Sequence, residues 1–280
     1  MRVDFADTVI NELANDEVLT PHDSIVAVCA GVRDSDLFER CGFRNVLITN
    51  LNEGDADERF EWSYQDAQQL SLKDDSFDFA FVADGLHHCA SPHRALLEMY
   101  RVARKGVIVI ESRDSLLMRA ANRFGLSPRY EVEAVVGSDF SSGGVDNSEV
   151  PNYIYRWTEA DFKKALSSFD PRGRHTFRFF YGLNLPYELA GWKKSSVKLK
   201  VIKAADPLLR GLTRVVKKQC NTMAMVALKP RIPHDLWPWL RVEDGRVAFA
   251  REYAGQHFKE IEGSRFSARP REDGEQKVAR

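Results

Sequence analysis

Apolar residues alternate along residues 4–230 between short continuous runs and longer stretches with helical spacing. Short runs rich in β-branched and aromatic side chains predict strands, whereas apolar residues three and four positions apart predict helices. The predicted strands cover residues 25–29, 44–50, 61–65, 77–83, 107–110, 176–180 and 221–228. The predicted helices alternate with them, at residues 4–17, 33–41, 91–105, 116–124, 158–168 and 206–218.

This alternation predicts an α/β fold with a mostly parallel, doubly wound sheet and right-handed crossovers. The run at 107–110 is continuous and β-branched, which is typical of a strand covered by helices on both faces. Residues 112–157 interrupt the rhythm and predict an insertion after the fifth strand. We expect residues 1–230 to form the main domain and residues 231–280 an accessory extension, with a polar, disordered tail from Ser264.

The composition fits a globular chain with one sizeable core, because 44% of its 280 residues are hydrophobic and 29% are charged. No apolar run approaches the roughly 20 residues that a membrane span needs. Residues 1–7 lack the basic start and apolar block of a signal peptide, so a cytoplasmic location without a membrane span is expected. The net charge of −1 produces no overall field that would attract nucleic acid, and nucleic acid is not expected as a partner.

The four cysteines are scattered along the chain without the paired spacing of a metal site or a disulfide framework. Reduced thiols are therefore expected at Cys29, Cys41, Cys89 and Cys220.

The first predicted strand ends in the small-residue turn Val28-Cys-Ala-Gly31 and leads directly into a helix. Small residues there let the backbone approach a ligand closely, and the following helix presents unpaired amides and positive dipole character. The pattern is that of the opening of a nucleotide-binding α/β unit, although an ordinary loop between a strand and a helix can carry the same glycine.

Three separated segments between residues 24 and 111 resemble the class I S-adenosylmethionine-dependent methyltransferases, specifically the small-molecule branch described as methyltransferase type 11. The first is the turn at Gly31. The second joins an acidic, apolar segment to a D-x-S-F-D pattern, and the third joins an L-H-H pattern to a helix and a basic turn. Their residues are Tyr64-Gln-Asp66-Ala-Gln-Gln-Leu70 with Asp75-Ser-Phe-Asp78, then Gly85-Leu-His-His88 with Ser91-Pro-His-Arg-Ala-Leu-Leu-Glu98 and Arg101-Val-Ala-Arg-Lys-Gly106.

The resemblance implies a Rossmann-like, seven-stranded sheet whose last strand is antiparallel, with S-adenosylmethionine as the cofactor. In this interpretation Asp66 accepts a hydrogen bond from the adenine amine, and the Ala67 backbone serves a ring nitrogen. Asn50 stands where the family usually has an acid that holds the ribose hydroxyls. Ala30 and Gly31 pass beneath the methionine portion of the cofactor.

The chain departs from the family pattern at three positions around the first strand. Ala27 replaces the usual acid inside that strand, Gly31 is all that is left of the glycine triplet, and Arg33 stands where a glycine is common. Arg33 either donates a charge-assisted hydrogen bond to the methionine carboxylate or points into water from the first helical turn. A nicotinamide-linked oxidoreductase is disfavoured, since it would have three glycines in the turn and an acid at Asn50.

Methyl transfer from a sulfonium needs alignment of the nucleophile and removal of its proton. His87 and His88 follow the fourth strand at its carboxyl end, so either is a candidate base, as in related O-methyltransferases; the alternative is that one bonds to the backbone and the other packs beside the cofactor. Asp84 is expected to contact the acceptor or to hold His88. No metal is expected, because the nearby Cys89 and His93 lack the usual separation of metal ligands.

Several further segments are candidates for binding the acceptor. Glu111 and Arg113 could orient the base or grip the substrate, and the aromatic residues of the insertion form either a pocket wall or, more typically, a small core of their own. Residues 191–231 contain eleven Lys or Arg against the single acid Asp206. These cations either coat a solvated helix or attract a phosphorylated, sugar-nucleotide or lipid-linked acceptor at a membrane surface.

The function that these residues favour is S-adenosylmethionine-dependent methylation of a small-molecule or glycan acceptor, on oxygen. The alternative is a non-catalytic module that keeps the methyltransferase fold for binding or assembly, which suits the reduced glycine content around Gly31.

Overall fold

The computed structural model describes residues 4–52, 58–185, 187 and 197–258. It divides the chain into two compact units. The first comprises residues 1–171 and 175–229, and the second comprises residues 172–174 and 230–280. The two units are described separately below.

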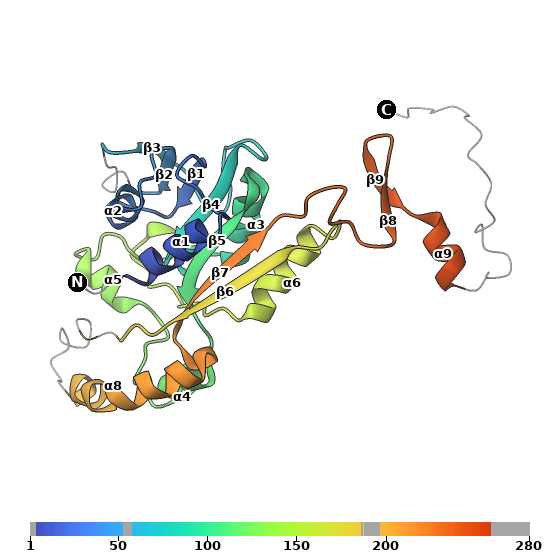
Figure 1. Ribbon diagram of the computed structural model, residues 1–280. Coiled ribbons are helices and arrows are strands. Elements are labelled where there is room, and N and C mark those ends of the chain that lie inside the picture. Colours follow the sequence, from blue (N-terminus) through green and yellow to red (C-terminus); the bar gives the residue numbers. More distant parts are fainter. Residues whose placement is uncertain (1–3, 53–57, 186, 188–196, 259–280) are drawn as a thin grey trace. The chain divides into compact units, whose positions relative to one another are not determined.

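A seven-stranded sheet forms the centre of the first unit (Figure 1). Six strands are parallel, and β7 is antiparallel to both of its neighbours, β5 and β6. This arrangement confirms the predicted Rossmann-like, doubly wound fold and its antiparallel strand. From one edge to the other the strands are β3 (Glu61–Tyr64), β2 (Val46–Asn50), β1 (Ile25–Val28), β4 (Phe77–Ala83), β5 (Ala103–Ser112), β7 (Thr222–Leu228) and β6 (Thr176–Gly182).

Helices cover both faces of this sheet, which explains why its central strands are continuous apolar runs. Apolar residues of α1 (Phe5–Asn15) and α2 (Val32–Arg40) pack on one face, and those of α3 (Pro92–Val102) and α6 (Glu159–Phe169) pack on the other. All four residues of β1 are buried. The sheet therefore presents only its edges and strand ends to other parts of the molecule.

Local sequence signals set the starts of two of these helices. The Ser91 hydroxyl accepts a hydrogen bond from the Arg94 amide, and Pro92 occupies the first turn of α3. Thr158 and Asp161 form a reciprocal capping box at the start of α6. Both starts agree with the sequence-based prediction.

The insertion after β5 contains α4 (Leu116–Arg123), α5 (Val132–Gly137) and the 3₁₀ turn η3 (Val145–Asn147). Its aromatic residues do not form a single core. Trp157 is fully buried and Tyr155 is partly buried, whereas the side chains of Tyr130, Phe140 and Tyr153 are exposed. The rings of Trp157 and Tyr155 pack into the core on the α3 and α6 face of the sheet, so these aromatic residues do not form the separate small core that was expected.

The prediction that a helix begins at Asp206 is wrong. Helix α8 spans Val197–Val215 and contains Pro207 in its interior. Asp206 forms an ion pair with Arg210 one turn later. An interior proline removes one backbone donor and its ring crowds the carbonyl four residues earlier, which costs about 3 kcal/mol, yet the helix of 19 residues continues through it.

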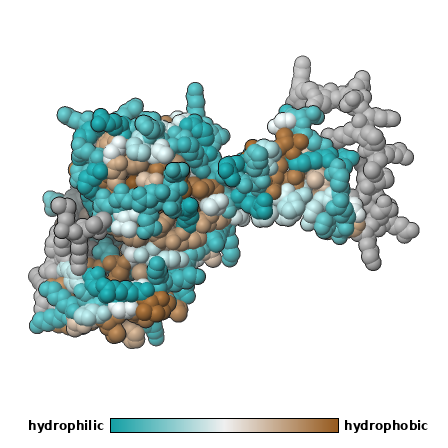
Figure 2. Space-filling model, in the orientation of Figure 1, coloured by the Kyte–Doolittle hydropathy of each residue, from teal (hydrophilic) through white to brown (hydrophobic). Residues whose placement is uncertain are grey.

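The surface of α8 carries exposed apolar side chains, which appear as brown patches in Figure 2. No helix among the described residues is long and apolar enough to cross a membrane.

The second unit contains a short hairpin, β8 (Leu240–Glu243) and β9 (Arg246–Phe249), followed by α9 (Arg251–His257). The rings of Trp237 and Trp239 stack in parallel with centroids 5.1 Å apart. The predicted disordered tail from Ser264 lies outside the described residues.

The carboxylate of Asp78 fixes the start of β4 to the neighbouring strands. Its Oδ2 accepts hydrogen bonds from the backbone and hydroxyl of Ser24, each 3.0 Å long, and its Oδ1 pairs with Arg104 at 2.9 Å and Lys105 at 3.3 Å. Burial favours the protonated acid, but these partners outweigh it and lower the pKa of Asp78 to about 2.

We predict that Asp78→Asn lowers the free energy of unfolding at pH 7 by about 2 kcal/mol, because the ionised carboxylate is preferred in the folded state. The difference from the wild type should shrink as the pH falls from 4 toward 2, where the native carboxylate becomes protonated. Urea unfolding at several pH values measures this. Asp36→Asn, on an exposed ion pair with Arg59, is the control with little effect; equal losses in both variants would contradict the prediction.

Candidate active site

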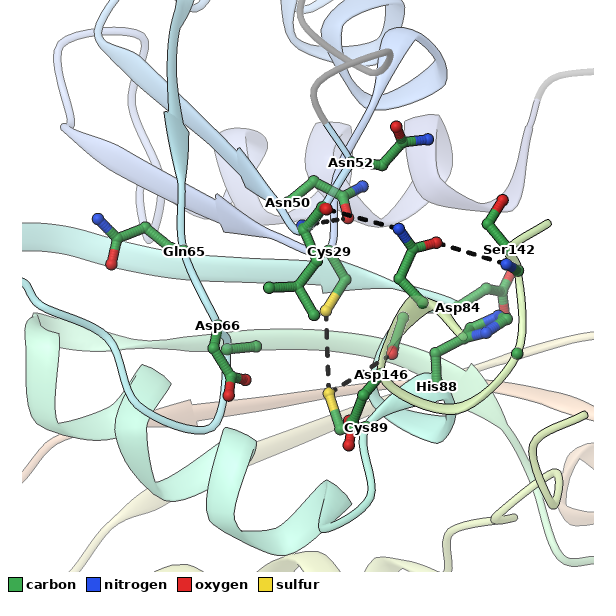
Figure 3. A pocket seen from close by; sticks show the side chains of 16 residues that line it. Cys29, Asn50, Asn52, Gln65, Asp66, Asp84, His88, Cys89, Ser142 and Asp146 are labelled. Atoms are coloured by element: carbon green, nitrogen blue, oxygen red, sulfur yellow. Dashed lines mark hydrogen bonds between the residues drawn. The ribbon is translucent and has the colours of Figure 1, made fainter. Parts of the chain in front are cut away.

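The carboxyl ends of β1, β2 and β4 meet at one edge of the sheet, where ligands bind in open α/β folds. A cavity of about 270 Å³ lies there (Figure 3). The ends of these strands and of β3, with the loops that follow them, supply most of its lining, and a segment of the insertion covers it. The lining residues are Cys29, Asn50, Leu51, Asn52, Gln65, Asp66, Ala67, Asp84, Gly85, His88, Cys89, Ser142, Gly143, Gly144, Asp146 and Asn147.

The loops after β1 and β4 touch at the floor of this cavity. A Cβ on Gly85 would lie 2.6 Å from the Cβ of Cys29, so only glycine fits at position 85. Cys29 itself has a φ of +51°, a left-handed conformation that costs an L-residue about 1–2 kcal/mol. The Sγ atoms of Cys29 and Cys89 lie 3.9 Å apart, and both thiols are free. The Cys29 side chain thus occupies part of this floor.

Asn50 braces the loop after β1 against the end of β2. Its Nδ2 donates to the carbonyl of Ala30 at 3.1 Å, and its Oδ1 accepts from the amide of Leu51 at 2.7 Å. These bonds fix the amide group at the wall of the cavity.

Asp66 and Ala67 lie on the loop after β3 and line the same cavity. The Asp66 Oδ1 accepts from the backbone amide of Gln68 at 2.8 Å, which closes a tight Asx turn. The Oδ2 atom has no hydrogen bond among those observed for Asp66, so the carboxylate can accept from a ligand.

His87 is buried in a chain of carboxylates rather than exposed to the cavity. Its Nδ1 lies 2.7 Å from Glu111 Oε2, and its Nε2 lies 3.1 Å from Glu131 Oε2. Burial would lower the pKa of His87, but the two carboxylates outweigh it and raise the pKa well above its ordinary value. His87 is therefore an imidazolium at neutral pH, and both of its nitrogens are occupied.

His88 differs from its neighbour, because its ring lines the cavity (Figure 3). Burial and the adjacent charge of His87 lower its pKa, so His88 is neutral at pH 7. Its Nε2 lies 3.3 Å from Glu131 Oε2, and it also hydrogen-bonds to the backbone of Gly144. Of the two candidate bases, only His88 combines a neutral ring with access to the cavity.

The carboxyl of Asp84 also lines the cavity, and burial together with the Glu111 carboxylate raises its pKa to about 6. The other charges that act on Asp84 are the cations His87 and Arg33 and the carboxylate of Glu131. With Asp84 ionised, three carboxylates face two cations, which leaves a net charge of −1 at this end of the site. The floor of the cavity therefore favours a cationic ligand group.

A segment of the insertion, residues 142–147, covers the cavity and is held by hydrogen bonds to its rim. The Asp146 Oδ1 accepts from the Ala90 amide at 2.9 Å and from Gln68 Nε2 at 3.0 Å. Asp146 and Asn147 both have left-handed backbone conformations, which these two residue types tolerate better than most. We call residues 142–147 the covering segment.

Four of the residues selected from the sequence do not line the cavity: His87, Ala30, Gly31 and Arg33. Ala30 is buried, and the amide of Gly31 donates to Asp34 Oδ2 at 3.0 Å. Arg33 is exposed. The remaining five, Asn50, Asp66, Ala67, Asp84 and His88, are brought together around it.

Two second-line candidates have structural roles, and two contributors were missed. Glu111 holds His87 rather than His88, and Arg113 pairs with Glu159 at 2.9 Å. Glu131 and Asn152 come from the insertion, where Asn152 Nδ2 donates to the His87 carbonyl at 3.0 Å and lies 3.3 Å from Glu131 Oε2. No local sequence pattern marks either residue.

Within the described residues, His87, His88 and Glu131 place candidate metal-ligand atoms within 4.8 Å of one another. Hydrogen bonds already connect these atoms, with Glu131 facing both rings. These hydrogen bonds pair the ring nitrogens of a protonated His87 with two carboxylates, those of Glu111 and Glu131. His93 lies elsewhere, with its ring 4.8 Å from that of Trp157.

Comparison with known proteins agrees with this fold. Residues 42–110 match the family model for the methyltransferase domain of the type 11 kind. The fold is similar to that of the YcgJ protein from Bacillus subtilis, with 10% identity, a TM-score of 0.50 and coverage of 80% of this chain and 99% of that one. This likeness shows a shared fold.

Two further structures show a weaker overall similarity. Magnesium protoporphyrin IX methyltransferase (ChlM) from Synechocystis PCC 6803, with bound SAH, is 15% identical, with a TM-score of 0.49 and coverage of 82% and 89%. A SAM-dependent methyltransferase from Thermotoga maritima is 18% identical, with a TM-score of 0.45 and coverage of 78% and 87%.

We predict that Asp146→Ala loosens the covering segment, because it removes both hydrogen bonds to the rim. Amide exchange at Gly144 and Val145, which donate to Ser148 and Val150, should become about fivefold faster or more. Hydrogen–deuterium exchange with mass spectrometry measures this. Glu149→Gln, at an exposed neighbour without a described contact to the rim, is the control; unchanged exchange in Asp146→Ala would show that other contacts hold the segment.

Proposed function

We propose that this class I S-adenosylmethionine-dependent methyltransferase of the type 11 kind methylates an oxygen of a small-molecule or glycan acceptor, with His88 as the base. The observation that carries the proposal is the neutral ring of His88 at the wall of the cavity. Asp84 lines the same cavity. The buried His87 positions Glu131 beside His88 through a hydrogen bond.

The residues around the cavity fit the groups that the cofactor presents. The Asp66 carboxylate suits the adenine amine, the Ala67 backbone suits a ring nitrogen, and the Asn50 amide suits a ribose hydroxyl. We propose that Ala30 and Gly31 support the methionine portion through the backbone of the loop, and that Arg33 attracts its carboxylate from the exposed first turn of α2.

The net negative charge around Asp84 supports the same assignment, because a sulfonium is a cation. When bound, S-adenosylmethionine supplies an electrophilic methyl group for an in-line displacement. The protein has to exclude water, align the acceptor and remove its proton, and alignment alone can contribute roughly 7–11 kcal/mol. The covering segment is the described part of the chain that lies over the cavity and can exclude water from it.

We propose that an acceptor hydroxyl replaces the Gly144 backbone as the partner of His88 and gives its proton to the ring nitrogen that carries none in the neutral ring, while the other nitrogen keeps its proton. The Glu131 carboxylate, 3.3 Å from His88 Nε2, stabilises the imidazolium that forms. His87 stays protonated between Glu111 and Glu131. Its positive charge keeps His88 neutral before the reaction. No metal is needed for this proton transfer.

The acceptor is further proposed to be anionic or lipid-linked. The support is the cationic stretch of residues 191–231, which contains eleven Lys or Arg. Cations there would raise the local concentration of such an acceptor.

We predict that Asp66→Ala weakens binding of S-adenosylhomocysteine about tenfold to a hundredfold, because a charge-assisted hydrogen bond to the adenine is lost. Isothermal titration measures the affinity, and thermal unfolding checks that the fold is kept. Asp36→Ala, outside the cavity, should bind like the wild type. If the wild-type protein itself shows no binding at millimolar ligand, the chain is a binding or assembly module rather than an enzyme.

We predict that His88→Gln lowers the rate of methylation about 10²–10⁴-fold while cofactor binding is kept. In the wild type the rate should be constant at neutral pH and fall below pH 6.5, because His88 acts when neutral and its pKa lies below the ordinary value. Fractions of cell extract provide the acceptor for this assay, and the transfer of label from the methyl donor measures the rate.

Two controls separate His88 from its neighbours. Asp84→Asn, which removes a neighbouring carboxyl whose pKa is about 6, should keep the acidic limb of the profile. Treatment with a chelator should leave the rate unchanged, and a chelator-sensitive rate would assign the cluster of His87, His88 and Glu131 to a metal ion instead.

A further inference from the structure

Helix α8 carries apolar side chains on two different faces. Ile202 and Leu209 are partly buried and Thr213 is buried, so one face packs on the first unit. A second set of apolar side chains is exposed, including Leu208 at 75% and Val215 at 84% exposure. A solvated surface helix has a polar face in that position, so the second face requires an explanation.

The exposed apolar residues of α8 form one continuous stripe. They are Val197, Val201, Leu208, Leu212 and Val215, with successive separations of four, seven, four and three residues. At about 100° of rotation per residue these positions lie within about 60° of one another around the helix. Single exposed apolar residues are common on proteins, but an aligned row along a whole helix marks an interaction surface.

Helix α4 adds to this surface in the same unit. It lies beside α8 in Figure 1, and both helices contact the short turn η4 (Lys217–Gln219). Its Leu116 and Phe124 are 70% and 77% exposed. Figure 2 shows brown patches at this end of the unit.

Cations surround the stripe, and acids are almost absent. Residues 197–219 contain seven Lys or Arg and one acid, Asp206, which is paired with Arg210. Lys200, Lys203, Arg214 and the lysines of η4 are exposed. An apolar stripe beside a row of cations is complementary to the boundary between anionic headgroups and acyl chains.

We propose that α8, supported by α4, docks the protein flat on an anionic membrane surface. The apolar stripe enters the acyl boundary, while the lysines and arginines remain at the level of the headgroups. An acidic protein surface would match the cations but leaves the stripe exposed to water. A second copy of this chain would match the stripe but brings two cationic surfaces together.

This docking does not depend on methyl transfer. It goes beyond the proposed acceptor, since the chain would bind a bilayer whether or not the acceptor is a lipid. Its test therefore uses vesicle binding, and cofactor binding serves as a separate measurement of the intact fold.

The experiment is flotation of the full chain with vesicles of phosphatidylglycerol and phosphatidylcholine, compared with phosphatidylcholine alone. We expect binding to the anionic vesicles that weakens as salt is raised from 0.05 to 0.5 M, because headgroup attraction is screened. Leu208→Asp with Val215→Asp should reduce the bound fraction at least about tenfold, since charged side chains cannot enter the acyl boundary. Lys217→Glu should weaken binding about fivefold or more.

Matched controls lie on other surfaces of the chain. Val242→Asp, on the exposed side of β8, tests an apolar-to-acid change elsewhere, and Arg94→Glu on α3 tests a charge reversal elsewhere. Both should float like the wild type, and all variants should keep the wild-type melting curve and affinity for S-adenosylhomocysteine. Failure of the wild type to bind anionic vesicles at low salt, or equal binding by the Leu208 and Val215 variant, overturns the proposal. A concentration-dependent dimer abolished by that variant assigns the surface to a second copy.

Discussion

The site depends on the buried carboxylate of Glu111 more than on any other single group. From the end of β5 it accepts hydrogen bonds from the Leu86 amide at 2.7 Å and from His87 Nδ1 at 2.7 Å. It thereby fixes the turn after β4 and the ring that separates His88 from the core. Removing one partner of a buried, paired charge costs about 3–5 kcal/mol, so this network persists only as a whole.

The same network ties the insertion to the sheet. Glu131 reaches both histidines, and Asn152 joins the His87 carbonyl to Glu131. The two imidazoles are 4.7 Å apart and sequence neighbours, yet opposite surroundings give them opposite charges. A difference of burial and partners, rather than of residue type, assigns one ring to structure and leaves the other to chemistry.

The fold could be predicted from the sequence because each of its elements has a local cause. The buried runs of β1, β4 and β5 and the caps at Ser91 and Thr158 act over a few residues, and most expected bounds differ from the observed ones by one or two positions. The site could be predicted only in part. Asn50, Asp66 and His88 lie at or just after strand ends, which the sequence pattern indicates. Glu131 reaches the two histidines, and Asp146 reaches the cavity, through an insertion whose path no local pattern determines. The predicted start of α8 is wrong because Asp206 followed by Pro207 has the sequence pattern of a helix N-terminus. In the structure Asp206 lies inside the helix and forms an ion pair with Arg210.

The insertion contributes to two parts of the site. It covers the cavity through residues 142–147, and it supplies Glu131, whose carboxylate raises the proton affinity of His88 against the larger effects of burial and of His87. With His88 as the proposed base, a change in the path of the insertion that alters the choice of acceptor would also alter the proton affinity of that base. Under the proposed function, selectivity and reactivity are therefore inherited together, and divergence toward a new substrate has to pass through sequences in which both remain matched.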